Sequence, residues 1–182
     1  ADVIVNSCRI LRSYAAEEGN GKNFEMYDEH IKQYTHILNA EIRSEELHQR
    51  VILNYYKPPS KRTNLTEHID TYCEALDGMA EPYDSPIIIY NKYLMWIYRH
   101  EMLQEFDQML KTCEAAEAYV AAHPIYYQSD RIKQIYIKKA SAYLHMRQAG
   151  GLETCLKYHS IFQAGNTEWY QFHEYLFLLA MH

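Results

Sequence analysis

Glu45 and His48, in "EELH", have the residue types and spacing of a metal-ligand pair. Three residues apart on a helix, a carboxylate and an imidazole lie on one face. A di-iron site of this kind needs a second such pair, and the sequence has none. "HEMLQ" (100–104) and "HEYLF" (173–177) lack the second histidine of the zinc-protease motif. We therefore interpret Glu45 as a residue of a helix's first turn and His48 as a packing or surface side chain. We expect no metal and no other cofactor.

"GNGK" (19–22) resembles part of a phosphate-binding loop. It lacks the longer glycine-spaced loop, a Ser or Thr after the lysine, and a preceding strand, so a turn between two helices is the better interpretation. The ten histidines are spread along the chain, and no Ser or Cys lies in a nucleophile motif. These observations favour a protein that is not an enzyme, with a triad assembled from distant residues as the alternative.

Charge and hydrophobic patterning argue against two classes of partner, nucleic acids and membranes. The 182 residues carry a net charge of -6 and no block of Lys and Arg, whereas binding nucleic acid requires a cationic face for the phosphates. The most apolar stretch, "IIIYNKYLMWIY" (87–98), is shorter than the roughly 20 residues that span a bilayer, and charged residues flank it. We expect a buried helix there, and neither a nucleic-acid partner nor a membrane partner.

Four cysteines lie far apart, each among apolar residues at helical spacing, which predicts buried free thiols. Free thiols are typical of a reducing, cytoplasmic compartment. "ADVIVNSCRILR" has no adequate apolar core for a secretory leader. Because the chain starts without Met and stops in the apolar run "YLFLLAMH", we expect a single domain, 1–182, that is a fragment of a longer protein or a processed one.

Scarce glycine and proline, clustered at a few breaks, predict an all-α protein. About nine helices are expected, at residues 3–17, 23–40, 45–57, 64–79, 86–98, 101–121, 130–147, 151–163 and 168–181. Suitable N-cap residues precede four of them: Ser44, Ser85, Ser129 and Thr167. "KPPSKR" (57–62) is expected to be a rigid, solvated connector, with docking of an acidic partner as the alternative.

The odd-numbered helices share a core pattern, in which two adjacent apolar residues are followed, three positions later, by another large apolar one. The blocks that show it are "RILRSY" (9–14), "RVILNY" (50–55), "KYLMWI" (92–97), "AYLHM" (142–146) and "EYLFLL" (174–179). Even-numbered helices carry apolar stripes of their own. A pair of amphipathic helices repeating at a period near 40 is typical of a stacked array of helical hairpins.

This pattern resembles that of the tetratricopeptide-type arrays. The third hairpin carries the resemblance best, with Tyr90, Tyr93, Leu94 and Ile97 on its first helix and Leu103, Phe106, Leu110 and Cys113 on its second. The family repeat is shorter and more regular, and it has small residues where this chain has Leu94 and Phe106. The resemblance implies a right-handed α-α superhelix of four hairpins plus a further first helix.

In tetratricopeptide arrays, the first helix of each hairpin lines a concave groove that binds a partner. The resemblance transfers that role to Arg12, Gln49, Leu53, Tyr56, Asn91, Met95, Tyr98, Leu144, Arg147, His173 and Phe177. Some members hold a peptide carboxylate with a basic–asparagine ladder, but the comparable ladder here is mostly apolar, so no carboxylate clamp is expected. Such a groove could accept an amphipathic helix or an extended peptide. The protein's own missing segments or a second copy could fill it instead, and simple packing between helices is the alternative for each residue.

The leading hypothesis is a non-catalytic scaffold that binds a protein or peptide through an apolar, Tyr- and Met-lined concave face, with self-association as a further possibility. The alternative is a sensor or regulatory module of a larger signalling or transcription protein. An α-helical enzyme is the third hypothesis.

Overall fold

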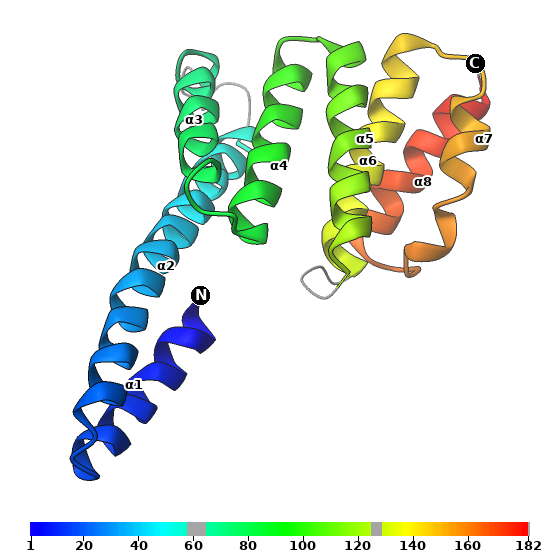
Figure 1. The fold of residues 1–182 in the computed structure, drawn as a ribbon. Helices are drawn as coiled ribbons and strands as arrows, with labels where there is room; N and C mark the ends of the chain where they lie inside the picture. Colours follow the sequence, from blue (N-terminus) through cyan, green and yellow to red (C-terminus); the bar gives the residue numbers. More distant parts are fainter. Residues whose placement is uncertain (58–64, 125–128, 182) are drawn as a thin grey trace.

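The protein is described by a computed structural model that covers residues 1–57, 65–124 and 129–181 (Figure 1). These residues are all-helical and contain no strand, as predicted. The helices are α1 (Asp2–Glu17), α2 (Gly21–Tyr55), α3 (Leu65–Ala80), α4 (Pro86–Met102), α5 (Phe106–Ala122), α6 (Ser129–Met146), α7 (Gly151–Leu156) and α8 (Thr167–Ala180), with a 3-10 turn at His159–Ile161. Across the same ranges, none of the helices combines the length and apolarity that crossing a membrane requires. Most of "KPPSKR" lies outside the described residues.

Helix α2 runs without a break through the region where two helices were expected. Ser44 was predicted to cap a new helix there, but it is buried inside α2, where its hydroxyl donates to the Glu41 carbonyl at 2.7 Å. The segment between the two expected helices contains neither glycine nor proline, and a serine that bonds to its own helix does not end it. The described part of the chain therefore has eight α-helices and not nine.

Other boundaries follow the predicted breaks with small shifts. "GNGK" is the turn between α1 and α2, and Asn20 caps α2 by accepting a bond from the Asn23 amide at 3.1 Å. Ser85 does precede α4, with Pro86 at the first position, but its hydroxyl donates to Glu41 Oε1 at 2.7 Å and caps no amide. Asn166, and not Thr167, caps α8.

The end of α4 also differs from the prediction. This helix continues to Met102, and the turn that follows contains Gln104 with a left-handed φ of 58°. Leu103 was predicted to belong to the apolar stripe of the next helix, but it lies in this turn and is 40% exposed. The predicted helix 151–163 is a short α7 followed by the 3-10 turn.

Three clusters of buried side chains run along the molecule from α2 to α8. The middle one joins α4, α5 and α6, and it confirms the predicted core residues Tyr90, Leu94, Ile97 and Cys113. A second joins α2, α3 and α4, and a third joins α6, α7 and α8. Helix α4 has residues in two of the clusters and contacts α2, α3, α5 and α6, which explains its apolarity on nearly all sides. The four cysteines are buried free thiols, as predicted.

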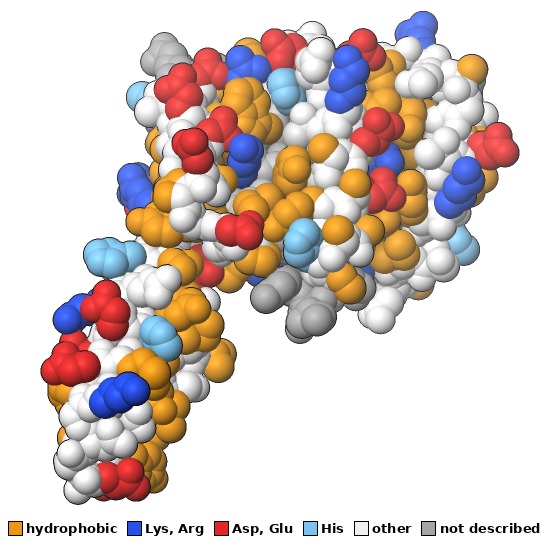
Figure 2. All heavy atoms as spheres, in the orientation of Figure 1, with side chains coloured by type: hydrophobic (Ala, Val, Ile, Leu, Met, Phe, Trp, Pro, Cys, Tyr) orange, Lys and Arg blue, Asp and Glu red, His pale blue; other side chains and the backbone are white. Residues whose placement is uncertain are grey.

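Helix α1 and residues 21–40 of α2 form an arm that projects from the remaining helices, which we call the body (Figure 1). The arm is an antiparallel pair, and the closest packing of α1 is on α2. Only small or medium side chains are buried in it, namely Val5, Cys8, Ala15 and Ala40. In Figure 2, hydrophobic side chains follow one edge of the arm at the surface.

Candidate functional site

A hollow of about 360 Å³ opens where four helices of the body meet, and we call it the four-helix hollow. It is lined by Glu45, His48 and Gln49 of α2, Tyr90, Asn91 and Leu94 of α4, Arg131 and Gln134 of α6, and Glu168 of α8. The spacing of three or four residues within each helix points these side chains to one side. Nearly all of them are polar, so the hollow differs from the apolar groove that was predicted.

Two polar atoms at this hollow are buried without a hydrogen-bond partner, His48 Nε2 and Gln134 Oε1. Burial, and secondly the nearby Arg131 guanidinium, lower the pKa of His48 to about 4. The imidazole is therefore neutral at pH 7. Its Nε2 is an acceptor or a donor, depending on the tautomer. A buried polar group without a partner costs about 1–3 kcal/mol, so the fold carries this cost at two positions beside the hollow.

Three charged residues line the same hollow, namely Glu45, Arg131 and Glu168. The Arg131 guanidinium lies 5.3 Å from the centre of the Tyr90 ring. The backbone carbonyl of Arg131 accepts a hydrogen bond from the Tyr90 hydroxyl at 2.6 Å. Within the described residues, neither Glu45 nor Glu168 forms an ion pair. Both carboxylates can therefore meet a partner's donors without first breaking a salt bridge.

Asn91 of α4, which lines the hollow, is hydrogen-bonded to α2. Its side-chain amide donates to the Ser44 hydroxyl at 3.0 Å, and both residues are buried. That bond runs between α4 and the middle of the long α2. Asn91 therefore positions the hollow, in addition to lining it.

A smaller hollow of about 70 Å³ adjoins the first and shares Gln134 and Glu168 with it. Its other lining residues are Tyr56, Tyr98, Ile137, Lys138 and Gln171. Lys138 Nζ lies 2.5 Å from Glu101 Oε2 and within 4.6 Å of the ring centres of Tyr55 and Tyr98. Burial lowers the pKa of Lys138, and the Glu101 carboxylate opposes that shift. The pair satisfies its own charges and forms a fixed wall for the site.

The predicted partner-binding residues do not gather on one surface. Gln49, Tyr56, Asn91 and Tyr98 line the two joined hollows. Leu53 lies on the α2 surface and is 65% exposed. Met95 is 0% exposed, in the core between α2, α3 and α4, because α3 covers the side of α4 that was expected to be open. A partner therefore cannot reach Met95 in this conformation.

The remaining residues of that set lie farther along the chain in both directions. Leu144 and Arg147 line a separate hollow of about 320 Å³ between the end of α6, α7 and α8. Arg12 lies on the arm, paired with Asp28, and its guanidinium is 5.8 Å from the centre of the Phe24 ring. His173 packs on Trp169, and Phe177 is exposed.

Sequence analysis did not single out Arg131, Gln134 or Glu168 as site residues. A usable signal exists on α6, where Arg131, Gln134 and Lys138 form a polar stripe at helical spacing on an otherwise largely buried helix. Glu168 follows Asn166 in the first turn of α8, a position where a carboxylate also suits the helix dipole, so its role there is not distinctive.

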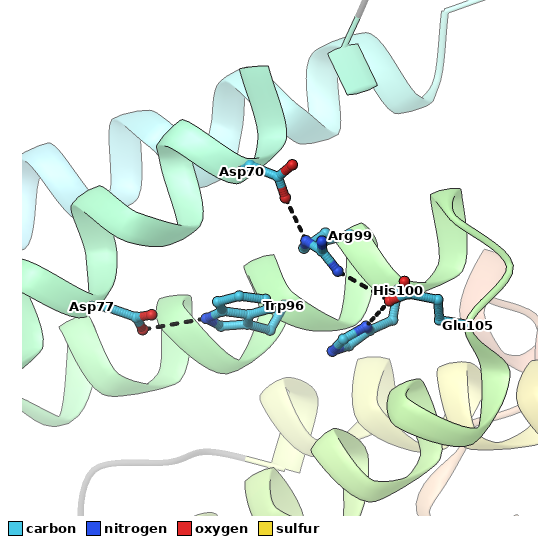
Figure 3. Close-up of polar contacts among 6 residues, drawn as sticks. All are labelled: Asp70, Asp77, Trp96, Arg99, His100 and Glu105. Carbon is cyan, nitrogen blue, oxygen red and sulfur yellow. Dashed lines mark hydrogen bonds and ion pairs between the residues drawn. The ribbon is translucent and has the colours of Figure 1, made fainter. Parts of the chain in front are cut away.

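The opposite side of α4 carries a polar network whose charges are all matched (Figure 3). Arg99 bonds to Asp70 of α3 at 2.5 Å and to Glu105 at 3.0 Å, and Glu105 also contacts His100 Nδ1 at 2.7 Å. The His100 bond is the largest cause of a lowered pKa for Glu105, and Arg99 adds to it. The Trp96 indole donates to Asp77 at 3.2 Å. This network links α3, α4 and the turn before α5, and it offers no unmatched group to a ligand.

Within the described ranges, no three or more His, Cys, Asp and Glu side chains gather as a metal-binding group. Comparison with protein-family models, curated proteins and solved structures found no match. The site must therefore be interpreted from its own geometry.

Proposed function

We propose that the protein is a non-catalytic scaffold that binds a protein or peptide segment through the four-helix hollow and the smaller hollow beside it. The observation that supports this most directly is the polar lining of one hollow, in which the carboxylates of Glu45 and Glu168 form no ion pair within the described residues. A ligand that offers hydrogen-bond donors to these carboxylates does not first have to break a salt bridge.

The chemistry of the hollow favours a segment rich in hydrogen-bond donors. Glu45 and Glu168 present acceptors, and a peptide offers backbone N–H groups as well as the side chains of Lys and Arg. The net charge of -6 would also steer a basic segment toward the protein. The Arg131 guanidinium, which lies over the Tyr90 ring, can donate to one acidic or carbonyl group of the same segment.

In this proposal the helices form a right-handed array of hairpins, as the resemblance to tetratricopeptide arrays implies. Helix α2 from residue 41 onward, α4, α6 and α8 act as the first helices, and α3, α5 and α7 as the second. The residues of both hollows come from the first helices alone, which is the arrangement that a groove along the array requires. The buried free thiols support a reducing compartment.

A displayed library of random peptides tests the proposal and does not require the natural partner. Peptides enriched on the wild type are synthesised, and their affinity is measured by fluorescence anisotropy. Gln134→Leu and Glu168→Gln are each expected to weaken binding by about tenfold or more, since each removes a group from the shared wall of the hollows. Glu153→Gln, on the exposed surface of α7, is the matched control and should bind normally.

Stability separates a binding role from a structural one. Replacing the unpartnered amide in Gln134→Leu should leave the free energy of unfolding unchanged or raise it by about 1 kcal/mol, because a buried orphan acceptor is removed. Affinity should fall in the same variant. Enrichment of no peptide, or equal affinity for the wild type and both hollow variants, would contradict the proposal.

A further inference from the structure

One face of α1 on the arm is apolar and uncovered. Along it, Val3, Ser7, Ile10 and Tyr14 follow one another at spacings of four, three and four residues, with Ile4 and Leu11 beside them. All six are exposed, with Val3 at 76%, Ile10 at 59% and Tyr14 at 60%. We call this set the outer α1 face.

The face that α1 turns toward α2 is a different one. Val5, Cys8 and Ala15 are buried there, while Arg9 and Ser13 lie on the polar side. The apolar arc of α1 is thus wider than α2 covers. A contiguous apolar face left open on one helix marks an interaction site.

Four apolar residues of the outer α1 face are placed symmetrically about Ser7. Val3 and Leu11 lie four residues before and after it, and Ile4 and Ile10 lie three residues before and after it. An identical helix laid antiparallel, with a two-fold axis through Ser7, therefore brings Val3 against Leu11 of the second copy and Ile4 against Ile10 of the second copy. The small serine at the axis allows the two backbones to approach closely. No charged residue belongs to this face, so the pairing buries no charge.

The chain exposes more surface than a compact chain of its mass. Its accessible surface is 11011 Å², whereas a compact monomer of 21.6 kDa exposes about 9,200 Å². The projecting arm is where the chain departs most from a compact shape (Figure 1).

We propose that a second copy of this chain docks on the outer α1 face, with the two α1 helices antiparallel about a two-fold axis at Ser7. The interface is isologous, so it closes as a dimer and does not propagate into a filament. The four-helix hollow of each copy stays outside this interface, and the proposal stands independently of the peptide-binding function.

A cysteine at the axis tests the geometry. In a Ser7→Cys variant the two thiols meet across the axis, and mild oxidation is expected to give a disulfide-linked dimer on non-reducing gels, since Cα atoms within about 7 Å can be bridged. Ser13→Cys is the matched control, because Ser13 is exposed on the polar side of the same helix. The natural cysteines are buried and do not compete. No linked dimer from Ser7→Cys, or equal cross-linking of both variants, overturns the arrangement.

The mass in solution tests the association itself. Sedimentation equilibrium of the wild type at about 100 μM is expected to give a dimer, and Ile10→Glu is expected to weaken it by about 100-fold or more. Phe177→Glu changes an equally exposed apolar residue on α8 and should leave the mass unchanged. Circular dichroism confirms that each variant is folded. A monomeric wild type at that concentration, or a dimer that persists in Ile10→Glu, refutes the proposal.

Discussion

The arm and the body are built from amphipathic helices of the same kind, but they differ in how many neighbours each helix has. In the body, α4 and α6 are covered on several sides, and aromatic and aliphatic side chains such as Phe172, Ile97 and Met109 are completely buried. In the arm, the two helices pack mainly on each other, and apolar residues of α1 remain exposed at the surface. Burial therefore follows from the number of neighbouring helices, and apolarity alone does not determine it.

The largest expected effect is the loss of a large side chain from the core of the body. Phe172 is 0% exposed and stacks on Phe162 with ring centres 4.1 Å apart. Phe172→Ala should lower the free energy of unfolding by about 3–5 kcal/mol, measured by urea denaturation. In the arm, Val5→Ala removes much less buried surface and should cost about 1–2 kcal/mol. Equal costs at the two positions would break the comparison.

Ion pairs should show the same contrast. Lys138 and Glu101 have side chains only 8% and 12% exposed, so Glu101→Gln leaves an uncompensated buried ammonium and should cost about 3 kcal/mol in chemical denaturation. The double variant Lys138→Met with Glu101→Leu should lie closer to the wild type, since no charge is then left alone. On the arm, Asp28 pairs with Arg12 and Lys32 at the surface, and Asp28→Asn should change stability far less. A larger loss from Asp28→Asn than from Glu101→Gln would contradict this account.

The body should also respond to acid through His48. Its pKa is about 4 in the folded protein against an ordinary value of 6.5, so the unfolded chain binds a proton first as the pH falls. The contribution of His48 to the free energy of unfolding is fully present above pH 6.5. As the pH falls from 6.5 to 4, the wild type should lose about 2–3 kcal/mol of that free energy through this group. His48→Gln should remove that loss, seen as a flatter curve of unfolding free energy against pH. His36→Gln, on the exposed arm surface, is the matched control and should parallel the wild type. Parallel curves for the wild type and His48→Gln would show that the imidazole does not titrate in this way.

The smallest effect expected is from the two helix caps. Asn20 in the arm and Asn166 in the body each accept a bond from the backbone amide three residues on. Replacing either with Ala should cost about 1 kcal/mol. For Asn166→Ala the loss should appear as a lower Tm of the whole protein. For Asn20→Ala it should appear as faster hydrogen exchange within 21–30 alone, because the arm can open without the body. Exchange that accelerates throughout the body in Asn20→Ala would show that the two regions unfold as one.

Much of the helical architecture could be predicted from the sequence by itself. Helix type, most breaks, the turn at "GNGK", the burial of the four cysteines and the core role of Tyr90, Leu94 and Ile97 all follow from local rules of periodicity and turn chemistry. The outer α1 face is visible in the same way, as an apolar arc wider than one neighbour can cover. These features depend on residues close together in the chain.

Only the tertiary structure decided what depends on neighbours distant in sequence. Ser44 could have ended a helix, but its bonds to Glu41 and Asn91 hold it inside one continuous α2. Met95 and Tyr98 occupy similar places in the sequence pattern, yet α3 covers Met95 completely while Tyr98 still borders a hollow. The four-helix hollow gathers side chains from α2, α4, α6 and α8 that lie up to 123 residues apart, from Glu45 to Glu168. Periodicity assigns each residue to a face of its own helix, but the packing of other helices determines which faces stay open and which polar atoms are left without a partner.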